Sequence, residues 1–407
     1  MSNTQKSSQN LAISKKKRST SVYAKYNESK PIVCDLNKYE EDLINHDKEK
    51  NKFLKVKNLP KTPITVIESR SHNTKPISIR NLCQSRFIKG PNVRKSLQLK
   101  WGSRPKTVLV IKKKDSKSAT RITKKILHYL VYGAKVNVLI EPSAQKDFPD
   151  NTPFKNDNKS YLNEIVDFVV SVGGDGTILH VCNLFNLQPI PPLLAFHSGT
   201  LGFLACYDYK DYRNSIKSTI KGKFFLTLRS RLVCRVFSNN ELVYKTNVLN
   251  EVVVGRGSSS HLCNLKCLCD EVSFTRIQAD GVLIGTPTGS TAYNLSAGGP
   301  ITHPSSSGIL FTPICAHSLS ARPLVFPDSV KLKIKVARSS RGTCTCFFDG
   351  INGCTLNRGD YIVISTSKYP LPSINRTNAI SDWFSGISTI LSWNDRKVVQ
   401  KPLSTKK

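Results

Sequence analysis

The sequence predicts an α/β N-terminal domain with a parallel sheet, followed by a β-rich C-terminal domain. Three observations support this prediction. Short apolar runs alternate with helical patterns between about residues 107 and 222, as in sheets covered by helices on both faces. After about Lys223, short β-rich runs separated by turn residues replace that alternation. With 407 residues, 39% of them hydrophobic, the chain is long enough to bury two cores.

The α/β domain is expected to begin with an all-apolar strand over residues 107–111. A helix should start within residues 115–120. Its apolar face would consist of Ile122, Ile126, Tyr129 and Leu130, and Gly133 would end it. Further strands are predicted over 136–140, 166–172 and 193–196. Such a sheet binds ligands beyond the carboxyl ends of its strands, where the Gly-rich turn after residue 172 would lie.

The β-rich domain should contain the runs FFLTL, LVCRVF, LVYKT and EVVVG, all within residues 224–255. The segment 382–396 predicts a helix that packs on the body, with one apolar face made of Phe384, Ile387, Ile390 and Leu391. The predicted organisation is a basic, largely disordered extension (1–95), the α/β domain (96–222), the β-rich domain (223–380), and a C-terminal helix with a basic tail (381–407).

The chain is strongly basic, with a formal charge of +33. Residues 1–105 hold 23 Lys and Arg against 8 Asp and Glu, so nearly half of the surplus of positive charge lies outside the expected catalytic core. A basic protein attracts polyanions, but charge alone does not choose between nucleic acid, an acidic membrane and a phosphate-rich small substrate. The run Lys15 to Arg18 fits either a solvated charge run or a nuclear address.

Targeting features predict a cytoplasmic protein, with nuclear and mitochondrial locations as alternatives. No stretch approaches 18 apolar residues, and the start lacks the apolar core of a secretory signal. The twelve cysteines have no regular spacing, so we interpret them as reduced thiols. We therefore expect no membrane partner.

The turn Gly173-Gly174-Asp175-Gly176-Thr177 predicts phosphate chemistry. Its glycines allow the backbone to approach a phosphate, and its amides can donate hydrogen bonds to it. A carboxylate at such a place repels phosphate unless it takes a proton from an attacking hydroxyl or faces a metal. The turn is neither a Walker loop nor a Rossmann fingerprint, since the residues that define those motifs are absent. The alternative is that Asp175 only supports a tight turn.

Three later segments give the turn its context. They are Ser198 to Leu204 (SGTLGFL), Asn250-Glu251, and Asp280-Gly281 followed by Thr286 to Tyr293 (TPTGSTAY). The turn by itself also occurs in diacylglycerol and sphingosine kinases, and in variant form in phosphofructokinases. Together and in this order, the four segments resemble the motifs of NAD kinases. Residues 97–115, 369–374 and 382–400 also resemble the eukaryotic cytosolic type of that family.

The resemblance implies the fold of NAD kinases and diacylglycerol kinases, and the ATP-dependent phosphorylation of the adenosine-ribose 2'-hydroxyl of NAD. It implies that Asp175 is the general base, that Mg²⁺ accompanies ATP, and that the protein is a homo-oligomer. Preferences for NAD or NADH and for the phosphoryl donor stay open. The implied binding residues for NAD, ATP or both are Gly173, Gly174, Gly176, Thr177, Asn250, Glu251, Asp280, Thr291, Ala292, Tyr293 and Ser296.

Three other functions remain alternatives: a lipid kinase, a nucleic-acid binder that uses the +33 charge, and a nucleotide-sensing pseudoenzyme. The TPTGSTAY segment opposes the first, the lack of a recognisable RNA or DNA module opposes the second, and Asp175 opposes the third. We therefore expect no nucleic-acid partner.

The segment from His261 to Cys269 departs from the family pattern by its thiols, as do Cys344 and Cys346. The segment lacks the closer ligand pairs of a zinc site, such as C-x2-C, so small apolar side chains on one strand face are the favoured interpretation and a metal site is the alternative. Gln278 and Ala279 differ from the bacterial pattern. The isolated His180, His197 and His303 are assigned no role.

Overall fold

The computed structural model describes residues 64–68, 77–78, 97–154, 161–222 and 224–394. Residues 55–407 form one compact unit, and all of the described residues belong to it. Most of the predicted basic extension lies outside the described residues. Two short strands within it are described and join the first sheet, as set out below. Across the described ranges, no helix is long and apolar enough to cross a membrane.

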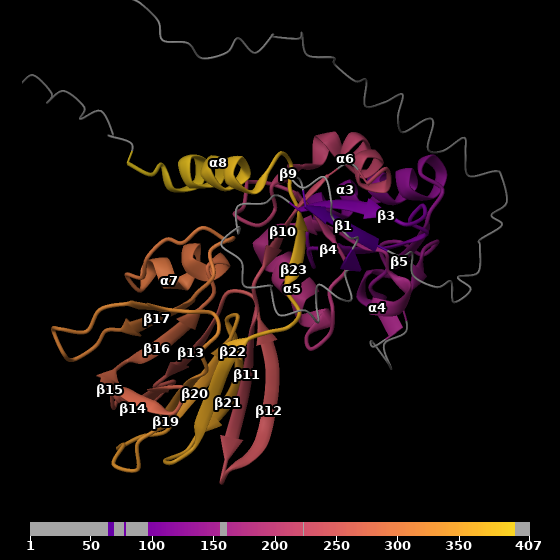
Figure 1. Cartoon of the computed structure of the whole chain (residues 1–407). Coiled ribbons are helices and arrows are strands. Elements are labelled where there is room, and N and C mark those ends of the chain that lie inside the picture. Colours follow the sequence, from indigo (N-terminus) through magenta and orange to yellow (C-terminus); the bar gives the residue numbers. More distant parts are fainter. Residues whose placement is uncertain (1–63, 69–76, 79–96, 155–160, 223, 395–407) are drawn as a thin grey trace, which may run out of the picture. The chain divides into compact units, whose positions relative to one another are not determined.

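The first domain is built on one mixed sheet (Figure 1). Its strand order is β2-β1-β3-β10-β23-β8-β7-β4-β5-β6, and β9 pairs with β8. The strands from β23 through β6 run parallel, which confirms the predicted parallel sheet. The strand bounds are β1 Ile64–Glu68, β2 Ile77–Ser78, β3 Leu97–Trp101, β4 Thr107–Lys112, β5 Asn137–Ile140, β6 Thr152–Pro153, β7 Phe168–Gly173, β8 Leu193–His197, β9 Tyr207–Asp208, β10 Phe225–Arg229 and β23 Leu371–Ile374.

The helices of this domain follow the predicted pattern. Helix α3 starts where Ser116 accepts a hydrogen bond from the Ala119 amide at 3.2 Å, and it buries Ile122 and Ile126 as expected. A π-helical turn then carries the chain to Gly133. The bounds are α3 Lys117–His128, the π-helix Tyr129–Gly133, α4 Leu162–Ile165, α5 Asp175–Phe185 and α6 Tyr212–Ile220, with 3-10 turns at Pro142–Ala144 and Tyr209–Asp211.

The second domain consists of two six-stranded antiparallel sheets, ordered β12-β11-β22-β19-β14-β15 and β18-β17-β16-β13-β20-β21. One buried apolar cluster draws side chains from both sheets. This arrangement confirms the predicted β-rich domain. The bounds are β11 Leu232–Ser238, β12 Glu241–Val248, β13 Glu251–Gly255, β14 Cys263–Cys269, β15 Val272–Ala279, β16 Gly281–Gly285, β17 Ile309–Ile314, β18 Leu324–Phe326, β19 Leu332–Val336, β20 Cys344–Phe348, β21 Ile351–Leu356 and β22 Tyr361–Thr366.

The run FFLTL differs from its expected place. It forms β10, which pairs with β3 and β23 in the first sheet rather than with the β-rich sheets. Strand β23 returns from the far end of the chain to the same sheet. Pairing over such a sequence separation depends on tertiary contacts that a local pattern cannot report.

The C-terminal helix α8 (Ala379–Leu391) packs on the body, as the sequence predicts, and its contacts are with β10. Its buried residues are Gly386 and Ile387, whereas Phe384 is 57% exposed. The predicted apolar face is therefore only partly buried. The smaller helical elements of this half of the chain are the 3-10 turn Thr288–Thr291 and α7 Tyr293–Ser296.

Arg231 and Asn186 connect the two domains. The fully buried Arg231 guanidinium donates to the carbonyls of Tyr369 (2.6 Å), Asn186 (2.8 Å) and Gln188 (3.0 Å). The Asn186 side chain accepts from the Asn247 amide of β12 at 2.8 Å. A buried cation that satisfies several carbonyls at the C-terminal end of α5 fixes that helix against the β-rich domain.

The described cysteines are free, as expected for reduced thiols. In β14, Cys263, Leu265 and Cys267 are buried on one side of the strand. These thiols therefore act as small apolar side chains of the core.

Candidate functional site

The Gly-rich turn joins the end of β7 to the start of α5. Gly174 precedes the first helical residue, Asp175, so the turn lies at the carboxyl end of a central parallel strand, as predicted. At Gly173 an added Cβ would lie 2.1 Å from Thr177 Oγ1. By contrast, nothing lies within 4 Å of a Cβ added at Gly174 or Gly176. The turn is tightly packed on its inner side and open in front of Gly174 and Gly176.

The Asp175 carboxylate is held by three successive backbone amides. Oδ2 accepts from the Phe203 amide at 3.0 Å, and Oδ1 accepts from the amides of Leu204 (3.1 Å) and Ala205 (3.2 Å). A carboxylate offers about four acceptor positions, so about one is left for a further donor. The amides of Phe203 and Leu204 belong to the SGTLGFL segment and Ala205 follows it directly, so two of the predicted motifs meet at this carboxylate.

Gly202 allows this close approach. A Cβ at this position would lie 2.2 Å from Asp175 Oδ1, which is shorter than any allowed contact. Gly199, in the same segment, has nothing within 4 Å of an added Cβ. Of these two glycines, only Gly202 is required by its contact with the carboxylate.

Asn250 and Glu251 lie where β13 begins, and Asp349 holds them there. The Asp349 carboxylate accepts from the amides of Leu249 (2.8 Å), Asn250 (2.7 Å) and Glu251 (3.2 Å). Asp349 has a φ of +48°, and Gly350 follows with a φ of +78°, in the tight turn between β20 and β21. The turn thus directs a carboxylate at the backbone of the predicted binding pair.

Burial changes the protonation of both acids. Desolvation raises the pKa of Glu251 to about 8, and the charge of Asp349 adds to the rise. Burial also raises the pKa of Asp349 to about 6, against the opposing effect of the three amides. Glu251 is 6% exposed and its Oε2 has no hydrogen-bond partner. At neutral pH Glu251 is therefore largely protonated and can donate a hydrogen bond.

The TPTGSTAY segment packs directly against Asn250. The Thr286 amide donates to the Asn250 carbonyl at 2.8 Å, and the Thr286 hydroxyl donates to the Leu249 carbonyl at 2.6 Å. A Cβ at Gly289 would lie 2.3 Å from the Asn250 carbonyl oxygen. The segment continues through Thr291 and Ala292 into α7, which holds Tyr293 and Ser296. Tyr293 is 45% exposed. The fold thus brings Asn250, Glu251 and this segment together.

Asp280 lies apart from that cluster. It precedes β16, whose other end, Gly285, pairs with Glu251. The distance from Asp280 to Gly285 along the strand is roughly 16 Å, at about 3.3 Å per residue. Arg256 forms an ion pair with Asp280, at 2.8 Å between Nε and Oδ1. Within one chain, Asp280 and Glu251 therefore lie at opposite ends of the β13–β16 strand pair.

Sequence reasoning did not assign a role to Gly202 or Asp349. Gly202 was visible only as one glycine of a motif, and its contact with Asp175 spans 27 residues. The Asp349-Gly350 pair was readable as a turn. Its contact with residues 249–251 crosses about a hundred residues, so no local pattern indicated it.

These features define a class: two-domain proteins in which an α/β domain carries a Gly-rich turn with a central carboxylate and a β-rich domain carries a polar strand end. Comparisons with known proteins identify the family within that class. Residues 108–224 match the model of the ATP-NAD kinase N-terminal domain, and residues 249–376 match that of the ATP-NAD kinase C-terminal domain.

Relatives and solved structures agree with that match. The chain is 36% identical over 301 residues to the mitochondrial NADH kinase of Schizosaccharomyces pombe, covering 73% of this chain and 77% of the relative. It is 39% identical over 312 residues to the chloroplastic NAD kinase 2 of Arabidopsis thaliana, covering 73% of this chain and 31% of the relative. The crystal structure of yeast NADH kinase with NADH superimposes with a TM-score of 0.69 at 34% identity, covering 77% of this chain and 95% of that one.

An NAD kinase from Archaeoglobus fulgidus, solved with ATP, shares the fold with a TM-score of 0.54 at 22% identity, covering 69% of this chain and 98% of that one. The chain belongs to the NAD kinase family. It spans 31% and 59% of the length of two rice NAD kinase relatives, so these relatives extend well beyond the region that they share with it.

Proposed function

We propose that this protein phosphorylates the adenosine-ribose 2'-hydroxyl of NAD, using ATP, and so forms NADP. Family membership supports this proposal, and one observation carries it most directly. The Asp175 carboxylate, at the mouth of a Gly-rich turn, keeps about one free acceptor position after binding three amides. That position suits a hydroxyl that must lose its proton to a base.

In this proposal Asp175 accepts the 2'-hydroxyl proton as the ribose oxygen attacks the terminal phosphorus of ATP, and the bond from that phosphorus to the bridging oxygen breaks to release ADP. The amides of residues 203–205 keep the carboxylate in one orientation, which lowers the entropic cost of reaching the reactive geometry. Gly173, Gly174, Gly176 and Thr177 form the turn that binds the dinucleotide pyrophosphate or the donor phosphates.

The β-rich domain would bind the rest of the dinucleotide. Asn250 and the protonated Glu251 offer both donors and acceptors to ribose hydroxyls. Thr291, Ala292, Tyr293 and Ser296 would line the base pockets, and the half-exposed Tyr293 ring is accessible to a ligand. Asp280 would bind the nicotinamide ribose. Because it lies at the far end of β16 from Glu251, a homo-oligomer in which a second copy presents Asp280 would fit this role.

A magnesium ion would arrive with the triphosphate. Magnesium usually keeps several waters and binds substrate phosphates. Since the position left on Asp175 is assigned to the ribose hydroxyl, phosphates and water would supply the ligands, and the turn would hold the ion through the triphosphate. When bound, the ion would neutralise charge on the transferred phosphoryl group. The carboxylate and the turn amides would position the reacting groups. We also propose a cytoplasmic location for the enzyme.

The test is NADP formation by the full-length protein with MgATP and NAD, in parallel with NADH. Asp175→Asn should lower kcat by at least about a hundredfold, since removing a general base typically costs about 10²–10⁴ in rate. The matched control is Asp150→Asn, because Asp150 is exposed and should not affect the rate.

A folded wild-type protein that binds NAD but forms no NADP from either coenzyme would contradict the proposal. Phosphorylation of diacylglycerol or sphingosine in place of NAD would favour a lipid kinase instead. A salt-sensitive DNA shift without NADP formation would favour the nucleic-acid binder.

A further inference from the structure

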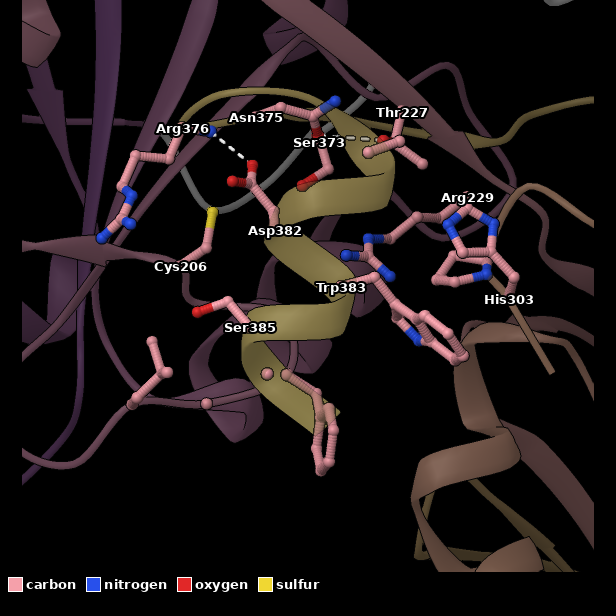
Figure 2. A pocket seen from close by; sticks show the side chains of 16 residues that line it. Cys206, Thr227, Arg229, His303, Ser373, Asn375, Arg376, Asp382, Trp383 and Ser385 are labelled. Atoms are coloured by element: carbon pink, nitrogen blue, oxygen red, sulfur yellow. Dashed lines mark hydrogen bonds between the residues drawn. The ribbon is translucent and has the colours of Figure 1, made fainter. Parts of the chain in front are cut away.

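A pocket with both polar and apolar lining residues lies between α8, β10 and the loop that holds Asp175 (Figure 2). Leu201, Gly202, Phe203 and Cys206 form its loop side, and Arg229 at the end of β10 and Asn375 after β23 contribute to its wall. Its volume is about 40 Å³. At about 10–15 Å³ for each water-sized group, it accommodates about three such groups, the number of free oxygens on a terminal phosphate.

The Arg229 guanidinium forms no ion pair among the described residues, although the charges of Asp175 and Asp382 act on it from a longer distance. Among the described residues, Arg229 has no carboxylate within 4.0 Å, and its buried Nε has no hydrogen-bond partner. Arginine stays charged at all relevant pH values, and a partly buried cation without a partner is costly. Figure 2 shows Arg229 lying together with His303 beside helix α8. The charge of Arg229 and, above all, burial lower the pKa of His303, so that this ring is neutral at pH 7.

The carboxylate of Asp382, which also lines the pocket, already accepts hydrogen bonds from neighbouring residues. Asp382 accepts from the amides of Arg376 (2.7 Å) and Thr377 (3.2 Å) and from the Thr377 hydroxyl (2.7 Å). Its two oxygens therefore hold the start of α8 rather than Arg229. Figure 2 shows this carboxylate turned toward Arg376.

A second group in the pocket also lacks a partner. Asn375 is 7% exposed, its Oδ1 accepts from the Thr227 hydroxyl at 2.9 Å, and its Nδ2 has no hydrogen-bond partner. An unsatisfied buried amide donor destabilises the fold unless a ligand accepts from it. The pocket thus contains a guanidinium without an ion pair, that of Arg229, and an amide donor without a partner, that of Asn375. Both would be satisfied by a negatively charged hydrogen-bond acceptor.

We propose that this pocket binds a phosphate group through Arg229 and Asn375. Its loop wall is continuous with the amides that hold Asp175, and the charge of Asp175 acts on Arg229. A phosphate bound here lies beside the group that is to accept the ribose proton. The phosphate is either the end of the triphosphate donor or a free phosphate ion. Only the first of these two sources rests on the proposed kinase function.

The first arm of the test needs no turnover. Orthophosphate and pyrophosphate are titrated into the full-length protein by calorimetry, with Trp383 fluorescence as a second readout because this indole lines the pocket. Arg229→Gln should weaken binding at least about tenfold, because hydrogen bonds between charged groups are stronger than those between neutral groups. Arg235→Gln, in β11 and outside the pocket, is the matched control.

Asn375→Asp is the second variant and guards against misfolding of the first. It keeps the acceptor for Thr227 and the shape of the side chain, while it places a competing negative charge in the pocket. It should weaken orthophosphate binding at least as much as Arg229→Gln. Thermal unfolding of each variant establishes that the protein is folded.

The second arm identifies the source. If the donor fills the pocket, orthophosphate competes with ATP, and Arg229→Gln raises the KM for ATP about tenfold with little change in the KM for NAD. If a free ion fills it, orthophosphate alters the rate without competing with ATP. Orthophosphate binding that is equal in the wild type and in both folded variants would overturn the proposal. Arg229-dependent binding without any NADP formation would leave the pocket established and reject only the kinase function.

Discussion

The two domains use the same device for different purposes. In each, one carboxylate accepts hydrogen bonds from three successive backbone amides that are distant in sequence. Asp175 binds the amides of residues 203–205, and Asp349 binds those of residues 249–251. In the α/β domain the acid that collects the amides is itself the candidate reactive group. In the β-rich domain the acid lies behind the candidate binding residues and sets their position.

This difference shows that a similar hydrogen-bond pattern gives no indication of a similar role. What separates the two acids is access to a ligand. Asp175 lies at an open turn, where Gly174 and Gly176 have free space in front of them. Asp349 is enclosed, and burial is the main cause of its raised pKa. Substitutions at the two places should therefore affect different steps.

After Asp175→Asn, the largest effect is expected from Gly202→Ala. The added Cβ would lie 2.2 Å from Asp175 Oδ1 and would displace the carboxylate without removing it. A displacement of about 1 Å at a reacting group can cost about a hundredfold in rate, so kcat for NADP formation should fall by about that factor. Gly199→Ala is the control, since its Cβ has free space. Equal rates for the two variants would show that the position of Asp175 is not critical.

Asp349→Asn should have a smaller effect and on another parameter. An amide group retains one acceptor oxygen but turns a donor toward a backbone amide, which loosens residues 249–251. We expect the KM for NAD to rise about tenfold, equivalent to about 1.4 kcal/mol, while kcat changes little. Steady-state kinetics with varied NAD measure this split. A fall in kcat at unchanged KM would mean that Asp349 serves the chemical step and would remove the distinction between the domains.

The smallest effect concerns stability against pH. The folded-state pKa of Glu251 is raised to about 8 from an ordinary value of 4.5, so the folded state holds the proton more tightly than the unfolded state. This contribution is fully present below pH 4.5 and is lost as the pH rises through 8. Between pH 7 and pH 9 the loss in unfolding free energy should be about 1 kcal/mol.

Urea unfolding at the two pH values measures this loss, and the Glu251→Gln variant separates it from other titrating groups. The variant should lose less stability than the wild type over the same interval, since glutamine has no proton to release. An identical pH dependence in both proteins would show that Glu251 does not hold a proton in the folded state, and that its role as a hydrogen-bond donor is wrong.

The sequence by itself determined the class of fold and the elements that carry the site. Apolar strands, helix starts and turns are local signals, so the strand before Gly173, the helix after Ser116 and the β-rich character of the second domain were predicted correctly. The Gly-rich turn indicated phosphate chemistry because its spacing is also local.

Only the tertiary structure decided what lies around these elements. It placed β10 in the first sheet, buried just part of the expected face of α8, and brought Asp349 to Asn250 and Gly202 to Asp175. It also left the Nε of Arg229 without a hydrogen-bond partner in a pocket that the C-terminal helix lines. The physical reason is that burial, pKa and hydrogen-bond partners depend on groups far apart in the chain. Such groups interact strongly only when packing brings them together and removes the water between them.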